Sequence, residues 1–276
     1  MINPRVNPLV NRLLKTIAAL ALLSAWPASA QMGQSLRASS TAAPPAPPST
    51  SAELADAAER VAQMERALAD WPNLAKYRAA NAALPPPEAS EKRVVFMGDS
   101  ITEIWSGVDP EFFTAHPSYV DRGISGQTTP QMLIRFRQDV IALRPAVVVI
   151  LAGTNDIAEN TGPTTVEAIE DNLESMAELA RASGIRVVLS SVLPVLDYSW
   201  HRGLNPASKI AALNSWTKDY CAKGGCVYLD YFSAMADARK GLPAALSGDG
   251  VHPNQAGFAI MDPLAEKAIA QALAQE

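Results

Sequence analysis

The sequence lacks a basic tract, and its 276 residues carry a formal net charge of -5. A nucleic-acid partner is therefore not expected. Only two cysteines are present, Cys221 and Cys226, and neither flank resembles a catalytic or metal-binding cysteine site. No apolar run reaches the ~20 residues that span a bilayer, which argues against a stable membrane anchor. The remaining composition, 48% hydrophobic and 18% charged, is ordinary for a globular protein with a real core.

Residues 1–30 have the features of an export signal. Basic residues precede an apolar run over residues 17–26, and Ala28-Ser29-Ala30 has the small-x-small form that a signal peptidase accepts. We therefore expect an exported protein, either periplasmic or secreted. In such an oxidising compartment Cys221 and Cys226 can form a disulfide, although two free buried thiols are an equal alternative.

Two further segments precede the main domain. Residues 31–50 are rich in Pro, Ala, Ser and Thr, which predicts a disordered linker. Residues 51–90 predict a helical extension, because Thr50 and Glu53 are spaced as a capping box and apolar residues recur on one face. These apolar residues are Leu54, Val61, Met64 and Leu68. We expect this extension to pack on the main domain, and an interaction surface is the alternative.

Residues 91–276 alternate between apolar runs and segments of helical period. The runs predict five strands, over residues 94–97, 119–120, 147–151, 187–189 and 227–229. Helices are expected over 129–145, over 164–184 with a Thr164/Glu167 capping box, over 205–216, and after Asn254 with a kink or restart at Asp262-Pro263. Regular alternation favours a three-layer, flavodoxin-like α/β fold, with a parallel five-stranded sheet of order 2-1-3-4-5 and helices on both faces.

In such folds ligands bind at the carboxyl ends of the strands, and polar and glycine residues gather there in this sequence. They are Gly98-Asp99-Ser100, Gly123-Ile124-Ser125-Gly126-Gln127, Gly153-Thr154-Asn155-Asp156 and Ser247-Gly248-Asp249-Gly250-Val251-His252. Ser100 is placed either as a nucleophile at a helix start or as a plain N-cap. Asp99 and Asp156 are interpreted as structural turn residues, and Ser125 as a residue that shapes its loop.

His252 is the one of three histidines that has an obvious orienting partner. Asp249 lies three residues before it in a turn, from where its carboxylate can accept the imidazole Nδ1–H and leave Nε2 free as a base. Neither His116 nor His201 has a carboxylate so placed. We therefore predict a catalytic set of Ser100 as nucleophile, His252 as base and Asp249 as orienter.

Acyl transfer also needs hydrogen-bond donors for the oxyanion of the tetrahedral intermediate. The Ser100 N–H, the Gly126 N–H and the Asn155 side-chain amide can supply them from three strand ends. Trp105, Trp200, His201 and Arg202 are placed in loops near this site, where they either line the substrate site or are plain surface residues.

The motifs together resemble the SGNH hydrolase superfamily, also called GDSL esterases and lipases. Gly98-Asp99-Ser100 matches its first block, Gly126 its second, Gly153-Thr154-Asn155-Asp156 its third and Asp249-Gly250-Val251-His252 its fifth. The resemblance covers Arg93 to about Ala270. It implies the same roles for Ser100, Gly126, Asn155, Asp249 and His252, in a hydrolase of esters without a metal or other cofactor.

The resemblance leaves the substrate open. No long apolar loop is visible to hold an acyl chain, so we expect short-chain carboxylic esters, acetyl esters of carbohydrates among them. A lysophospholipase or thioesterase is the alternative within the same class. A non-catalytic carbohydrate-binding module on the same fold, or a flavodoxin-like cofactor binder, is the alternative outside it. The oligomeric state is not predicted.

Overall fold

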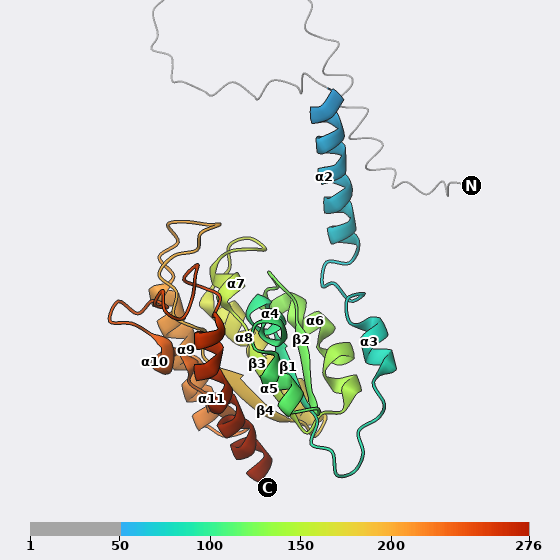
Figure 1. Cartoon of the computed structure of the whole chain (residues 1–276), viewed down its shortest axis with the longest axis vertical. Coiled ribbons are helices and arrows are strands. Elements are labelled where there is room, and N and C mark those ends of the chain that lie inside the picture. Colours follow the sequence, from blue (N-terminus) through green and yellow to red (C-terminus); the bar gives the residue numbers. More distant parts are fainter. Residues whose placement is uncertain (1–50, 276) are drawn as a thin grey trace, which may run out of the picture. The chain divides into compact units, whose positions relative to one another are not determined.

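The computed structural model describes residues 51–275 (Figure 1). The expected export signal and linker lie outside the described residues, as does Thr50 of the expected capping box. The chain divides after Leu54, and Ala55–Glu276 forms one compact unit.

The predicted parallel sheet is confirmed, with five strands in the order β2-β1-β3-β4-β5. The strands are β1 (Val94–Gly98), β2 (Tyr119–Gly123), β3 (Val147–Leu151), β4 (Arg186–Ser190) and β5 (Val227–Leu229). Central strand β1 pairs on one side with β2 and on the other with β3, so that Val94 is level with Tyr119 and with Val147. The chain reverses its order at β1, which places the crevice for a ligand at the carboxyl end of this strand.

Each central strand is buried on both faces, which explains its unbroken apolar sequence. Alternate side chains point to opposite sides of the sheet, so Val95 and Met97 enter one core while Val94 and Phe96 enter the other. Two hydrophobic layers therefore hold the sheet from both sides, and its carboxyl edge is left for polar residues.

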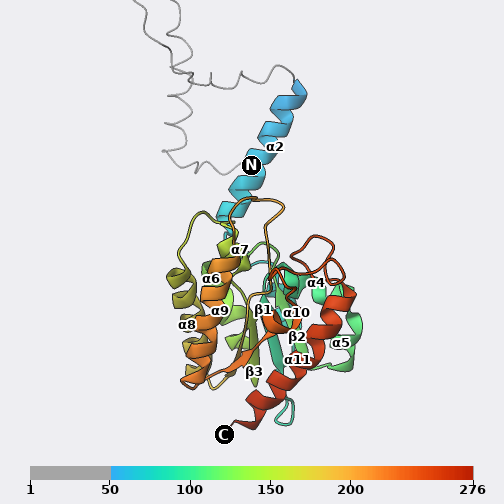
Figure 2. The ribbon, with the colours of Figure 1, turned by 90° about the vertical axis from the view of Figure 1, so that its left-hand side faces the viewer.

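Helices cover both faces, as predicted (Figure 2). One layer contains α6 (Thr129–Asp139), α8 (Val166–Ala182) and α9 (Ala207–Ala222), and the other contains α4 (Ser100–Val108), α5 (Pro110–Ala115), α10 (Tyr231–Met235) and α11 (Gln255–Ala274). A single turn of helix, α7 (Thr154–Ile157), follows β3, and a 3-10 turn, η1 (Ile141–Leu143), follows α6.

Several helix boundaries differ from the sequence-based expectation. The N-cap of α8 is Thr165, whose side chain accepts from the Ala168 N–H, and not Thr164. Helix α11 runs through Pro263 as one helix, without the expected restart. A proline costs a helix interior about 3 kcal/mol, and burial of apolar residues on both sides of Pro263, including Met261 and Ile269, offsets that cost.

The N-terminal extension contains α2 (Ser51–Ala69) and α3 (Arg78–Ala83). The expected packing of the extension on the main domain is wrong for the apolar face of α2, because Val61, Met64 and Leu68 are 54%, 62% and 75% exposed. The segment after α2 is the part that contacts the domain. Its residues form hydrogen bonds with β2 and α6, among them Gln138 Nε2 to the Leu74 carbonyl at 2.8 Å and Asn81 Nδ2 to Asp139 at 2.7 Å.

Cys221 and Cys226 form a disulfide at the C-terminal end of α9, which decides between the two alternatives left open by the sequence. The bridge closes the short turn between α9 and β5. Both cysteines are buried.

Candidate active site

The structure brings three of the predicted residues into one hydrogen-bonded line. Ser100 Oγ lies 2.8 Å from His252 Nε2. His252 Nδ1 lies 2.7 Å from Asp249 Oδ2. Ser100 and His252 are 152 residues apart in the chain, so only the fold makes this contact.

Ser100 owes its position to the sharp turn that ends β1. A side chain at Gly98 is excluded there, because a Cβ would lie 2.0 Å from Thr102 Oγ1. Asp99 is the N-cap of α4 and accepts from the Ile101 N–H at 2.9 Å, so Ser100 is not the cap. Ser100 is the first residue of this helix, where backbone N–H groups have no partner within the helix and favour a developing negative charge.

The turn that carries His252 is organised by the Asp249 carboxylate. One of its oxygens, Oδ1, accepts from the Val251 and His252 N–H groups at 2.9 and 2.8 Å and from Ser247 Oγ at 3.1 Å. Partial burial alone would raise the pKa of Asp249, but the hydrogen bonds from His252 and from these N–H groups hold it well below the usual range. Asp249 is therefore an anion across the physiological range, and it favours a proton on His252 Nδ1.

The two other predicted residues lie beside Ser100. Gly126 follows β2 with a φ of +76°, and its N–H donates no hydrogen bond within the part of the chain that the structure describes. A Cβ at this position would meet only the Asn160 side chain, at 3.9 Å, so the space above the turn is open. Asn155, on α7, is buried and donates one Nδ2 hydrogen to the Gln127 carbonyl at 3.1 Å.

Sequence reasoning missed the residues that orient Asn155. Asn160 Nδ2 donates to Asn155 Oδ1 at 2.8 Å, and Trp200 Nε1 donates to Asn160 Oδ1 at 3.0 Å. These two hydrogen bonds fix the orientation of the Asn155 side-chain amide, because its Oδ1 must face Asn160. No spacing in the sequence indicates it, because Trp200 lies 40 residues beyond Asn160.

The turn that carries Gly126 is held by Glu103 of α4, also missed from the sequence. Glu103 Oε2 accepts from both the N–H and the Oγ of Ser125 at 2.6 Å. Its other oxygen forms an ion pair with Lys76 of the N-terminal extension. Burial alone would raise the pKa of Glu103, but the hydrogen bonds from Lys76 and Ser125 lower it, so this clamp carries a negative charge.

A buried arginine joins the strand ends beneath the site. Arg135 donates to the carbonyls of Gly98 and Arg122 at 2.9 and 2.8 Å and to the Gln127 side chain at 2.5 Å. Asp139 neutralises its charge at 3.2 Å, and both side chains are fully buried. The Gly98 carbonyl also accepts from the Ile124 N–H at 3.0 Å, so Arg135 gives it a second donor at the carboxyl edge of the sheet.

The buried carboxylates Asp99 and Asp156 have the structural contacts expected of them. Asp156 accepts from the N–H and the Oγ1 of Thr129, which ties α7 to α6. Burial raises the pKa of Asp99 to about 7, and one of its oxygens has no hydrogen-bond partner within the described residues. At neutral pH a large share of the molecules therefore carries a neutral carboxyl beside Ser100, which spares a developing oxyanion a negative neighbour.

A pocket of about 500 Å³ opens above these residues. Its lining consists of Ser100, Ile104, Ser125, Gly126, Asn155, Asn160, Trp200 and His252. Trp200 therefore lines the site, with its ring centroid 6.3 Å from that of His252. The other three candidates do not line it, and the expectation of a loop position is wrong for Trp105, which is buried in α4 and donates to Asp262.

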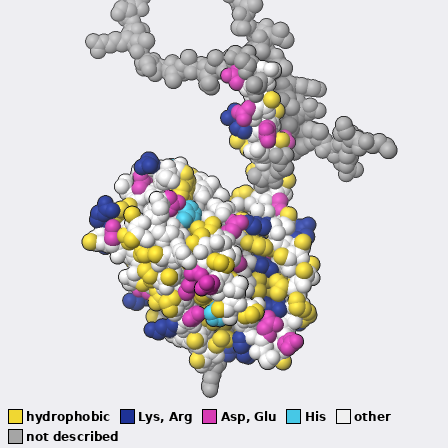
Figure 3. All heavy atoms as spheres, viewed as in Figure 1, with side chains coloured by type: hydrophobic (Ala, Val, Ile, Leu, Met, Phe, Trp, Pro, Cys, Tyr) yellow, Lys and Arg dark blue, Asp and Glu magenta, His cyan; other side chains and the backbone are white. Residues whose placement is uncertain are grey.

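The face of the molecule shown in Figure 3 carries charged side chains of both signs. Lys and Arg side chains are scattered over the face shown in Figure 3 and do not gather in one patch.

Between residues 51 and 275, no group of three or more His, Cys, Asp or Glu side chains is arranged to hold a metal ion. No helix in this same part of the chain is long and apolar enough to cross a bilayer.

A parallel sheet with helices on both faces and a Ser–His–Asp line at its carboxyl edge is the arrangement of a serine hydrolase. The particular family follows from comparison with known proteins. The chain belongs to the GDSL-like lipase/acylhydrolase family, whose model matches residues 96–260.

Individual relatives agree with this assignment. A solved structure of a GDSL-like lipase from Bacteroides thetaiotaomicron is 45% identical, with a TM-score of 0.71 over 73% of this chain and 98% of that one. An acetylxylan esterase from Geobacillus stearothermophilus is 25% identical over 62% of this chain and 91% of its own length. An uncharacterized lipoprotein of Bacillus subtilis, YqeF, is 32% identical over 28% of this chain. The matched stretch spans only 33% of the length of that relative.

Proposed function

We propose that the protein is an exported serine esterase that hydrolyses short-chain carboxylic esters, acetyl esters of carbohydrates among them, through an acyl-enzyme. The observation that carries this proposal is the continuous contact from Ser100 Oγ to His252 and on to Asp249, at 2.8 and 2.7 Å. A nucleophile, a base and an orienter in hydrogen-bond contact form the arrangement that acyl transfer requires.

In the first half of the reaction, Ser100 Oγ attacks the ester carbonyl carbon while His252 Nε2 accepts the hydroxyl proton. The imidazolium that forms is stabilised by Asp249. When the tetrahedral intermediate collapses, the bond to the alcohol oxygen breaks, and the alcohol leaves with the proton from His252. A water molecule then repeats the sequence on the acyl-enzyme and releases the acid.

We assign the oxyanion of both intermediates to three donors: the N–H groups of Ser100 and Gly126, and the second Nδ2 hydrogen of Asn155. Support comes from the open N–H of Gly126 and from the amide chain that orients Asn155. Donors fixed before the reaction stabilise the transition state without a cost of reorganisation, and one of them typically contributes ~10²–10³ in turnover.

The expected acyl group is short because Ile104 and Trp200 are the only large apolar residues in the lining. The esterase from Geobacillus stearothermophilus, whose name specifies an acetyl ester, supports the same size. We expect kcat/KM for p-nitrophenyl esters to fall at least tenfold from acetate to octanoate, as a pocket without a long apolar channel predicts. A rise along the series would favour the lysophospholipase or thioesterase alternative, and no hydrolysis at all would favour a non-catalytic carbohydrate-binding module.

We further propose residues 1–30 as an export signal, 31–50 as a linker, 51–90 as a helical extension and 91–276 as the hydrolase domain. A buried disulfide between Cys221 and Cys226 supports an oxidising compartment, either periplasmic or extracellular. The relative YqeF is itself named a lipoprotein.

The clamp on the Gly126 turn leads to a testable result. Replacing Glu103 by alanine removes both hydrogen bonds to Ser125, and we expect kcat to fall about tenfold with little change in KM, because a small displacement of a donor costs transition-state binding. Glu103→Gln keeps an acceptor for Ser125 and should lose less. Glu111→Ala, an exposed acid on α5, is the control, and steady-state kinetics with p-nitrophenyl acetate is the measurement. An unchanged kcat in Glu103→Ala would show that the turn holds its position without the clamp.

A further inference from the structure

A second pocket lies next to the catalytic pocket and shares Ser125 and Gly126 with it. Its volume is about 380 Å³. The opposite wall comes from the N-terminal extension, through Asp70, Trp71 and Asn73. These residues lie outside the stretch that matches the family model, residues 96–260. The extension therefore adds a pocket that the family motifs do not include.

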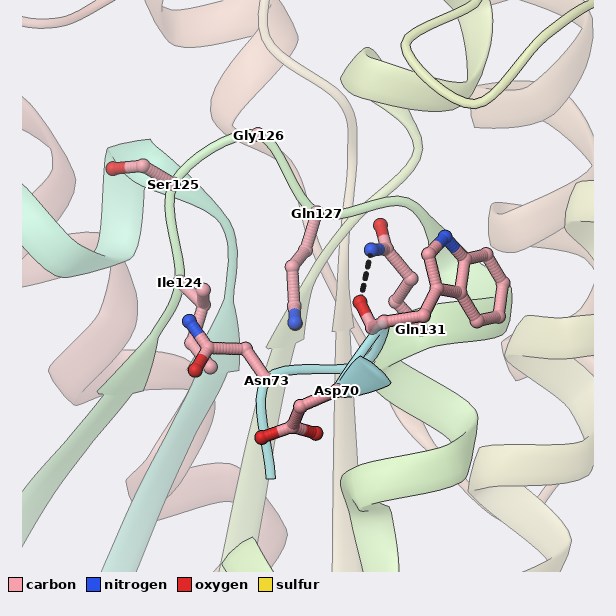
Figure 4. Close-up of a pocket in the computed structure, with 8 residues that line it drawn as sticks. Asp70, Asn73, Ile124, Ser125, Gly126, Gln127 and Gln131 are labelled. Atoms are coloured by element: carbon pink, nitrogen blue, oxygen red, sulfur yellow. Dashed lines mark hydrogen bonds between the residues drawn. The ribbon is translucent and has the colours of Figure 1, made fainter. Parts of the chain in front are cut away.

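The walls of this pocket are held together by side-chain amides. Gln127 Nε2 donates to the Pro72 carbonyl at 2.7 Å. Gln131 Nε2 donates to the Trp71 carbonyl, also at 2.7 Å (Figure 4). The Asp70 carboxylate accepts from the N–H groups of Leu74 and Ala75 at 2.7 and 2.8 Å. The segment is thus fixed against the Gly126 turn, and the pocket exists before any ligand arrives.

Two polar groups of the lining, the side-chain amide of Asn73 and the indole N–H of Trp71, are left available to a ligand. The side chains of Asn73 and Gln127 point into the space between the extension and the turn in Figure 4, and the Gln127 amide is already bound on both sides. In the described part of the chain, neither the side-chain amide of Asn73 nor the indole N–H of Trp71 has a hydrogen-bond partner. Asn73 is exposed, and Trp71 is 38% exposed.

This lining suits a neutral polyhydroxyl compound. An amide supplies donors and an acceptor, an indole supplies a donor and an aromatic face, and sugar rings use both kinds of contact. An anion is disfavoured, because Asp70 is the only charged residue of the lining. A long acyl chain is disfavoured as well, because Trp71 and Ile124 are the only large apolar residues of the lining.

The position relative to Ser100 gives the pocket its role. The two pockets meet at the Gly126 turn, where no side chain stands and a Cβ would find only Asn160, at 3.9 Å. A chain of sugar units whose acyl group lies at Ser100 can therefore cross the turn and place a neighbouring unit between Trp71 and Asn73.

We propose that this second pocket is a subsite for a neutral sugar unit of an oligosaccharide ester, so that the N-terminal extension selects acylated oligosaccharides over small alcohol esters. The proposal rests on the proposed esterase function and deepens it. It also assigns to the extension a part in substrate binding that is independent of the chemical step.

The test compares two substrates, p-nitrophenyl acetate and an acetylated xylooligosaccharide, in the full chain. We expect Trp71→Ala and Asn73→Gly to raise KM for the oligosaccharide about tenfold and to leave its kcat and the kinetics of p-nitrophenyl acetate unchanged, as loss of a binding contact away from the reacting atoms predicts. Trp71→Phe keeps an aromatic face and should fall between. Asn205→Gly is the matched control, because Asn205 is also exposed with a positive φ, 49° against 54° for Asn73.

An unchanged KM for the oligosaccharide in both variants, or an equal loss on both substrates, overturns the subsite. Failure of the esterase function itself is recognised separately, as absence of p-nitrophenyl acetate hydrolysis by the unmodified chain. In that case calorimetric titration of the Ser100→Ala protein with unacetylated xylotetraose still decides the subsite. Binding weakened about tenfold by Trp71→Ala supports it, and binding that is absent or unaffected by this change excludes it.

Discussion

Ser100→Ala is expected to lower kcat for p-nitrophenyl acetate by on the order of 10⁶, the size of effect seen when a serine nucleophile is removed from an intact catalytic set. The physical reason is the loss of the covalent route. Without Oγ, His252 has no hydroxyl to deprotonate, and only transition-state binding by the remaining donors is left. The fold should be kept, because the N-cap of α4 is Asp99 and not Ser100.

Two further variants of the chain make this experiment decisive. Ser106→Ala removes a hydroxyl from the same helix, away from the pocket lining, and should hydrolyse the ester at the unmodified rate. The double variant Ser100→Ala/His252→Ala should be no slower than Ser100→Ala alone, because the two side chains act as one unit. Equal rates for Ser100→Ala and the unmodified protein would remove Ser100 as the nucleophile.

The second large effect is expected at Asp249. Asp249→Asn should lower kcat by about 10⁴, because it reverses the histidine tautomer. The Oδ1 position accepts from the N–H groups of Val251 and His252, so an asparagine must keep its carbonyl oxygen there. The amide NH₂ of the asparagine then donates to His252 Nδ1 and forces the ring proton onto Nε2. A protonated Nε2 can no longer accept the proton of Ser100.

The matched control for this change is Asp237→Asn. Asp237 also accepts from two backbone N–H groups of its own turn, Arg239 and Gly241, at 2.8 and 2.9 Å, but it has no histidine partner. Its replacement should leave kcat unchanged. If Asp249→Asn lowered thermal stability but not kcat at a temperature where the protein is folded, Asp249 would be a turn residue only.

The site was predictable to the extent that its residues follow strand ends. The polar and glycine residues after β1, β2 and β3 were expected to meet because parallel strands present their carboxyl ends at one edge. Asp249 was assigned to His252 because three residues of turn bring the two side chains together. These are short-range or topological relations, and both can be derived from the order of residues.

Residues that act through distant partners escaped prediction. No pattern in the sequence indicated a role for Glu103, because its partners Ser125 and Lys76 are brought to it only by the fold. The orienting role of Asn160 depends on Trp200, and nothing in either local sequence indicates the other. Trp105 was misplaced in a loop although it lies four residues after Ile101 and both are buried in α4. Burial against Phe96 and Phe258 holds it in position.

Strand and helix order, the sheet topology and the candidate catalytic residues and donors could thus be predicted from local pattern, because periodicity and turn chemistry act between near neighbours. The disulfide joins cysteines five residues apart, and the sequence left its formation open. Packing decided the exposed face of α2, the continuity of α11 through Pro263, the clamp on the Gly126 turn and the pocket that the extension builds beside it. Packing depends on contacts between segments far apart in the chain, whose free energies exceed local preferences and which no local pattern contains.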